Sequence, residues 1–151
     1  VKIYDLKPEM SAYLITDKLM EELEKDYDLV VLNYANGDMV GHTGNYEATK
    51  KAVKALDKCL KRLYKKAQEK KYTLLIIADH GNCDYMIDNN NNIVTSHSVS
   101  PVPCIVTDKN IKLKNGRLCD VAPTLLNIMG IEIPSEMTGE SLIERKWKIW
   151  K

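Results

Sequence analysis

Apolar side chains recur along this chain with two different spacings, and the first spacing predicts three helices. Intervals of three and four residues place apolar positions on one face of a helix, and they recur in residues 12–25, 46–70 and 120–129. Pro123 near the start of the third stretch and Gly130 just after it are typical of helix ends. Each stretch also begins at or just after a residue that commonly caps a helix: Ser11, Asn45 and Asp120.

The second spacing is a continuous apolar run, which predicts strands. Residues 28–34, 74–77 and 104–107 contain such runs, as expected for strands buried on both faces of a parallel sheet. Residues 83–94 predict a hairpin around an asparagine-rich turn, and residues 1–9 read as an extended lead-in. Strands that alternate with helices in this way predict an α/β fold with a mostly parallel sheet.

Polar residues with candidate chemistry follow the first two apolar runs. Asp79 and His80 follow residues 74–77 with one residue, Ala78, between. Gly81 gives the loop the freedom to turn both side chains toward one point. Asp38 and His42 follow the first run, four residues apart, within a glycine-rich stretch that fits either a helical turn or an irregular loop. Ligands of open α/β sheets bind at the carboxyl ends of the strands, so we expect these side chains to meet.

His97 lies in the loop before the third run and completes the set, because the predicted hairpin returns it toward His80. Taken singly, each motif also fits a solvated loop. However, all 3 histidines of the chain lie in polar segments that come after apolar runs. Imidazole together with carboxylate suits Mn, Zn or Fe better than Ca or Mg. Five ligands exceed what one four-coordinate ion needs, which favours two ions. The expected metal ligands are Asp38, His42, Asp79, His80 and His97.

Composition narrows the class of protein. At 151 residues with 44% hydrophobic and 28% charged residues, the chain has the size of one domain and ordinary globular content. A net charge of +1 gives no reason to expect nucleic acid or an anionic membrane as a partner. No signal peptide or long apolar run is present, so we expect a cytoplasmic protein. The 4 cysteines are widely spaced and read as reduced thiols.

Two parts of a phosphoryl-transfer site are missing from the sequence. Ser96 and Ser98 flank His97, but nothing marks either as an activated nucleophile. No arginine lies near the histidine motifs to grip a phosphate. The chain also begins at Val1 and enters structured-looking sequence almost at once, so we expect a piece of a longer protein.

Five segments together resemble the cofactor-independent phosphoglycerate mutases of the alkaline phosphatase superfamily. The resemblance extends over nearly the whole chain, with Gly37 where proline is common and Cys83 where a small or acidic residue is common. It rests on these segments: 4–11 (YDLKPEMS), 33–44 (NYANGDMVGHTG), 78–82 (ADHGN), 95–103 (TSHSVSPVP) and 118–126 (LCDVAPTLL).

The resemblance implies a fold and roles for these residues. The fold would be the three-layer alkaline phosphatase-like one, with helices on both faces of the sheet, present here incompletely as a single domain over residues 1–151. Asp38, His42 and His97 would hold one Mn²⁺, with Zn, Co or Mg as alternatives. Asp79 and His80 would hold a second, together with an Asp and the nucleophilic Ser from the missing N-terminal part of the same enzyme.

The implied reaction interconverts 3- and 2-phosphoglycerate in glycolysis through a phosphoserine, without 2,3-bisphosphoglycerate. The intact enzyme would be a monomer, whereas this piece alone would be inactive and could pair with a second copy through an open sheet edge. Two alternatives stay open. One is another superfamily metalloenzyme, such as a phosphopentomutase or a phosphatase, and the other is a non-catalytic metal-binding domain.

Overall fold

The computed structural model describes residues 4–144 and divides into two compact units. Unit 1 contains residues up to Tyr72 and the segment His80–Val102, and unit 2 contains Thr73–Asp79 and the chain from Pro103 onward. The sequence predicted one domain over residues 1–151, and the division into two compact units does not test that prediction. Trp147 and Trp150, which end the predicted tail, lie outside the described residues.

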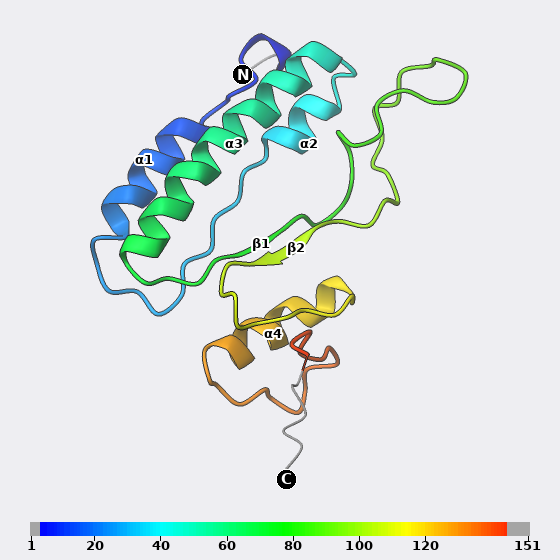
Figure 1. Ribbon diagram of the computed structural model, residues 1–151. Helices are drawn as coiled ribbons and strands as arrows, with labels where there is room; N and C mark the ends of the chain where they lie inside the picture. Colours follow the sequence, from blue (N-terminus) through cyan, green and yellow to red (C-terminus); the bar gives the residue numbers. More distant parts are fainter. Residues whose placement is uncertain (1–3, 145–151) are drawn as a thin grey trace. The chain divides into compact units, whose positions relative to one another are not determined.

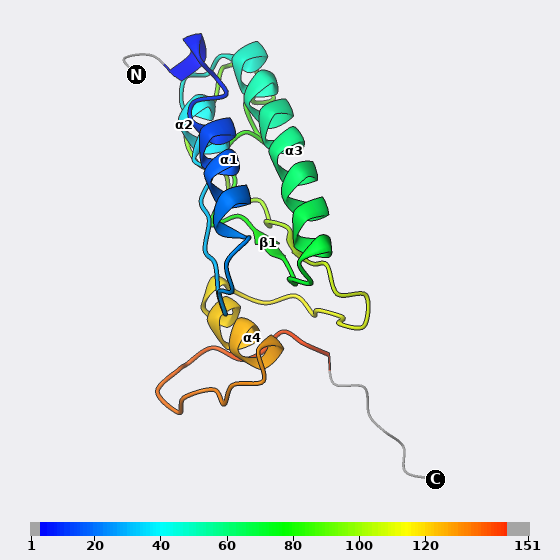
Figure 2. The ribbon, with the colours of Figure 1, turned by 90° about the vertical axis from the view of Figure 1, so that its left-hand side faces the viewer.

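Unit 1 is built on two helices that lie side by side and run in the same direction, α1 (Ala12–Glu22) and α3 (Tyr46–Glu69) (Figures 1 and 2). The two helices are in contact along their length, and each carries a buried leucine, Leu19 on α1 and Leu63 on α3. Ion pairs join the exposed flanks, as in the 2.6 Å contact between Arg62 and Asp17. The periodicity of the sequence therefore predicted both helices.

The short helix α2 (Asn36–Gly41) packs against the first part of α3. Val40 of α2 is fully buried and forms a small core with Ala48 and Ala52 of α3. The side chain of Asn36 is buried as well, and its amide donates to the carbonyl oxygens of Pro8 and Glu9 at 2.9 and 2.8 Å. These contacts fix α2 to the rest of unit 1.

The three predicted helix starts are confirmed, but of the three predicted capping residues only Asn45 makes a side-chain capping hydrogen bond. Asn45 caps α3, because its side chain accepts a hydrogen bond from the backbone N–H of Ala48. Ser11 makes no such bond to α1, and residues 4–6, expected to be extended, form the short 3₁₀ helix η1 (Tyr4–Leu6).

The segment 28–34 is not a strand, contrary to expectation. It has no strand partner among the described residues, and Val31 is 83% exposed. A continuous apolar run specifies a strand only when neighbouring strands satisfy its backbone groups and cover its faces, so the local pattern was not sufficient here.

Unit 2 contains a sheet of two strands, β1 (Leu75–Ile77) and β2 (Cys104–Val106). The strands are antiparallel, with Ile76 opposite Ile105. Both strands were predicted, but the parallel pairing and burial on both faces are wrong for this pair, since Ile77 and Ile105 are 40% and 52% exposed.

The helical part of unit 2 consists of η2 (Leu118–Asp120) and α4 (Val121–Ile128). The carboxylate of Asp120 does not cap α4. It accepts instead from the backbone N–H groups of Arg117 and Glu140 at 2.7 and 2.9 Å, and these bonds hold the pKa of Asp120 below its usual range. Asp120 therefore connects the loop before the helix to the loop after it.

Candidate metal centre

Helix α2 places the first two candidate ligands. Asp38 and His42 are four residues apart, and the helical turn between them puts both side chains on one face. One carboxylate oxygen of Asp38, Oδ1, lies 3.0 Å from Nε2 of His42. Of the two geometries that fitted the sequence, the structure has the helical one.

A backbone bridge between Gly81 and Ser98 aligns the segments that carry the other two histidines. The N–H of Ser98 donates to the carbonyl of Gly81 at 2.9 Å, and the hydroxyl of Ser98 donates to the carboxylate of Asp84 at 2.9 Å. A Cβ on Gly81 would lie 2.1 Å from the Ser98 hydroxyl oxygen, so the approach requires glycine. Hydrogen bonds from Ser100 and Ser98 hold the pKa of Asp84 below its usual range.

The residues next to this bridge, His80 and His97, stack face to face. Their ring centroids are 3.6 Å apart and the ring planes differ by 17°. The predicted hairpin is also present, reduced to one bridge between Ile87 and Ile93. It returns His97 to the neighbourhood of His80, as the sequence predicted.

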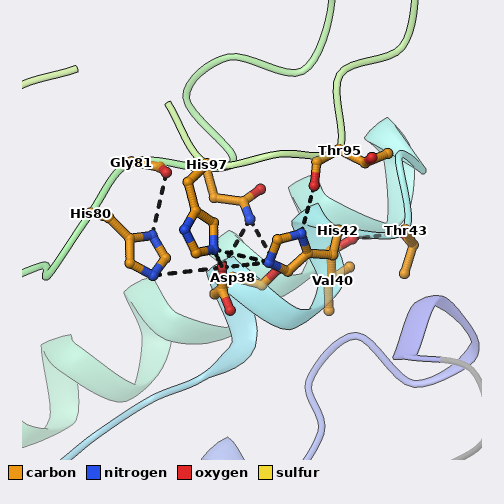
Figure 3. Close-up of polar contacts among 9 residues, drawn as sticks. Asp38, Val40, His42, Thr43, His80, Gly81, Thr95 and His97 are labelled. Carbon is orange, nitrogen blue, oxygen red and sulfur yellow. Dashed lines mark hydrogen bonds and ion pairs between the residues drawn. The ribbon is translucent and has the colours of Figure 1, made fainter. Parts of the chain in front are cut away.

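Asp38, His42 and His97 converge on one point (Figure 3). Nε2 of His97 lies 3.1 Å from Oδ1 of Asp38 and 3.1 Å from Nε2 of His42. All three side chains are partly exposed, so solvent and ions have access to the point where they meet. The convergence predicted for these three residues is present in the structure.

A backbone carbonyl sets the orientation of His42. Nδ1 of His42 lies 2.5 Å from the carbonyl oxygen of Thr95, which can only accept, so Nδ1 carries the proton of this bond. In the neutral ring Nε2 then presents a lone pair toward Asp38 and His97. Lone pairs that face one another at this distance repel unless a proton or a metal cation lies between them. A histidine bonded through its other nitrogen is the usual arrangement of metal ligands.

The three ligand atoms also have the spacing of a metal site. Two ligands at adjacent corners of an octahedron are separated by about 3.0 Å when each bond is about 2.1 Å long. The observed separations are 3.0, 3.1 and 3.1 Å. Two histidines and one carboxylate on one face of an octahedron form a known type of divalent-metal site with open positions, so the residues present fit an ion.

The other two predicted ligands are placed differently. Nε2 of His80 lies 3.9 Å from Oδ1 of Asp38, and its Nδ1 lies 3.3 Å from the carbonyl oxygen of Gly81 (Figure 3). His80 therefore borders the group, stacked on His97 and at the outer limit of an ion-pair distance from the Asp38 carboxylate. Asp79 belongs to unit 2, where it follows β1 with an exposed side chain.

Asn82 is a participant that the sequence reasoning missed. Its side chain is buried and its amide donates to Oδ1 of Asp38 at 2.9 Å. The available signal in the sequence was its position directly after Asp79-His80-Gly81. It was not recognised because asparagine is mostly an exposed residue. The four cysteines are free thiols in the structure, and burial raises the pKa of the Cys83 thiol.

None of the helices within residues 4–144 combines the length and the apolar character that crossing a bilayer requires.

Comparison with known proteins connects this geometry to enzymes. The chain is 55% identical over 148 residues to the 2,3-bisphosphoglycerate-independent phosphoglycerate mutase of Ehrlichia ruminantium, covering 95% of this chain and 30% of the relative. It is 52% identical over 147 residues to the enzyme of the same name from Bacteroides thetaiotaomicron, with 95% and 29% covered. The chain thus spans about 30% of the length of these curated relatives.

A crystal structure of Leishmania mexicana phosphoglycerate mutase at low cobalt concentration has the same fold, with a TM-score of 0.85 and 33% sequence identity. The match covers 95% of this chain and 30% of that one. This likeness confirms the predicted α/β fold of alkaline phosphatase type, present here in part. A family model described as the metalloenzyme superfamily matches residues 1–133. By this match and by the metal-ligand geometry in unit 1, the chain belongs to the metalloenzyme superfamily.

Proposed function

We propose that the chain is the C-terminal metal-binding part of a phosphoglycerate mutase that interconverts 3- and 2-phosphoglycerate. The observation that carries the proposal is the convergence of Asp38, His42 and His97. It occurs in a chain of which 95% aligns at 55% identity with a phosphoglycerate mutase. The proposed setting is glycolysis in the cytoplasm, with phosphoglycerate as the substrate and the remainder of the enzyme as the partner.

In this proposal Asp38, His42 and His97 hold one Mn²⁺, and Asp79 and His80 supply part of a second site. Two imidazoles and one carboxylate suit Mn, Zn or Co better than Ca. Asp38 supplies one negative charge toward an ion of charge +2, which leaves the site with a net positive charge for an anionic phosphate. The second ion would need further ligands from the upstream part.

Bound ions of this kind clamp the attacking and leaving oxygens of a transferring phosphoryl group. The residues of this chain hold the candidate metal ligands in place. Helix α2 fixes the spacing of Asp38 and His42, and the Thr95 carbonyl holds the His42 ring with Nε2 facing inward. The bridge between Gly81 and Ser98 holds the His97 segment against that face. The nucleophilic serine and the phosphate-binding arginines would come from the upstream part.

Metal titration of the 151-residue chain tests the metal role. We expect about one tightly bound Mn²⁺ or Co²⁺ per chain, and an affinity about 100-fold lower or worse in Asp38→Asn and His97→Ala, since each loses a ligand. Asp26→Asn, which removes an exposed carboxylate in the same unit, is the matched control and should bind normally. Equal affinity in Asp38→Asn and Asp26→Asn would rule the site out.

A coupled assay with 3-phosphoglycerate and Mn²⁺ tests the activity. We expect no turnover by the chain alone and turnover of about 1 per second or more for the protein that includes the upstream part. His80→Ala in the longer protein should remove most of this activity while leaving thermal unfolding unchanged. Turnover by the chain alone would place the nucleophile in these residues.

A further inference from the structure

Asn82 is a buried amide directly behind the candidate ligand Asp38. Asn82 as a whole residue is 6% exposed, and its Nδ2 group donates to Oδ1 of Asp38 at 2.9 Å and to the backbone carbonyl of Asp38 at 3.4 Å. Both acceptors are oxygens that cannot donate, so the amide has to present its N–H₂ side to Asp38. Its carbonyl oxygen must therefore point the other way.

That oxygen, Oδ1 of Asn82, is buried without a hydrogen-bond partner. An unpaired buried polar atom costs about 1–3 kcal/mol, so packing alone does not account for an asparagine at this place. The oxygen lies against Gly41 of α2, where an added Cβ would come within 2.2 Å of it. The amide thus occupies space that exists only because residue 41 has no side chain.

The hydrogen bond acts on the same carboxylate oxygen that faces the two imidazoles. Oδ1 of Asp38 receives the Asn82 N–H while it lies 3.0 Å from Nε2 of His42 and 3.1 Å from Nε2 of His97. A carboxylate held by one donor cannot rotate freely about its side-chain bonds. Groups that hydrogen-bond to a metal ligand orient it, and their loss typically lowers metal affinity by about 10- to 100-fold.

We propose that Asn82 is a positioning residue that holds the Asp38 carboxylate in its metal-binding orientation, and that Gly41 is needed to admit it. This inference rests on the proposed metal site. Asn82 acts through Asp38 and contributes no ligand of its own. The pair of Gly41 and Asn82 joins α2 to the loop after Asp79-His80, which makes the orientation of Asp38 depend on both segments.

The test is the affinity of the 151-residue chain for Mn²⁺ and Co²⁺, measured beside thermal unfolding of the metal-free chain. Asn82→Ala should lower both affinities by about 10- to 100-fold and change the visible absorption of bound Co²⁺. Asn82→Leu keeps the branching and the number of side-chain heavy atoms without the donor and should show the same loss. It provides a second variant if Asn82→Ala fails to fold. Asn89→Ala, at an exposed asparagine, should bind normally.

Gly41 supplies the second arm of the test. Gly41→Ala should weaken metal binding about as much as Asn82→Ala, and the double variant should be no weaker than Asn82→Ala, because both changes break one contact. Gly37→Ala is the control within the same helix, since its Cβ would meet Sγ of Cys83 at an ordinary 3.7 Å. It should leave the affinity unchanged.

Two results would overturn the inference in distinguishable ways. Lower stability with unchanged metal affinity in both Asn82 variants would reduce Asn82 to a structural residue and leave the metal site standing. Absence of metal binding by the unchanged chain would overturn the metal site and the positioning role together.

Discussion

Gly44 follows α2 with a backbone φ of +69°, and two side chains of the His97 segment occupy the space beside it. A Cβ on Gly44 would lie 2.6 Å from Cγ2 of Ile93 and 3.1 Å from Cγ2 of Thr95. The left-handed conformation costs an ordinary residue about 1–2 kcal/mol. Displacing the two methyl groups adds about 1 kcal/mol, at the low end for overpacking, because Ile93 is 66% exposed and can move.

Gly44→Ala should therefore lower the free energy of unfolding by about 2–3 kcal/mol. Gly130 offers a matched control, since its φ is +71° and no heavy atom lies within 4 Å of its added Cβ. Gly130→Ala should lose only the conformational part, about 1–2 kcal/mol. Urea unfolding of the two variants beside the unchanged chain measures the difference.

Gly44→Ala should also weaken the metal site, because the segment that it displaces carries the Thr95 carbonyl that binds His42. Ile93→Ala in the Gly44→Ala background removes the closest contact and should recover part of both the stability and the Mn²⁺ affinity. Equal losses in Gly44→Ala and Gly130→Ala, with no recovery in the double variant, would refute the packing argument.

Three further predictions concern buried groups, two in unit 2 and one in the small core of unit 1. Thr124→Val should lower the free energy of unfolding by about 1–3 kcal/mol, measured in urea, because the buried Thr124 hydroxyl accepts from the N–H of Leu142 at 2.9 Å; Thr138→Val, at an exposed threonine, is the control. The folded-state pKa of Asp120 is lowered from 3.8, so the stabilisation by its carboxylate is present above pH 3.8 and is lost as the pH falls through the folded-state pKa. Asp120→Asn should therefore be less stable than the unchanged chain at pH 6. From pH 5 to pH 3 the variant should lose less stability than the unchanged chain. Val40→Ala removes two fully buried methyl groups and should lower the free energy of unfolding by about 2 kcal/mol, which an unchanged urea midpoint would contradict.

The helices were predictable from the sequence because their causes are local. The apolar spacing of α1 and α3 and the Asn45 cap depend on residues three or four positions apart. The four-residue interval between Asp38 and His42 belongs to the same class, and the structure needed only to select the helical turn. The apolar runs at β1 and β2 likewise predicted extended chain.

Pairing was not predictable, because a run of apolar residues does not state which neighbour it will have. The antiparallel order of β1 and β2 and the exposed segment 28–34 depend on partners distant in sequence. The same holds within the site. The His42 ring is oriented by a carbonyl 53 residues away, and Asp38 is held by an amide 44 residues away. The sequence by itself predicted Asp38, His42 and His97 as members of one candidate site. The orientation of their side chains comes from the tertiary structure, because hydrogen bonds between distant segments produce no regular spacing along the chain.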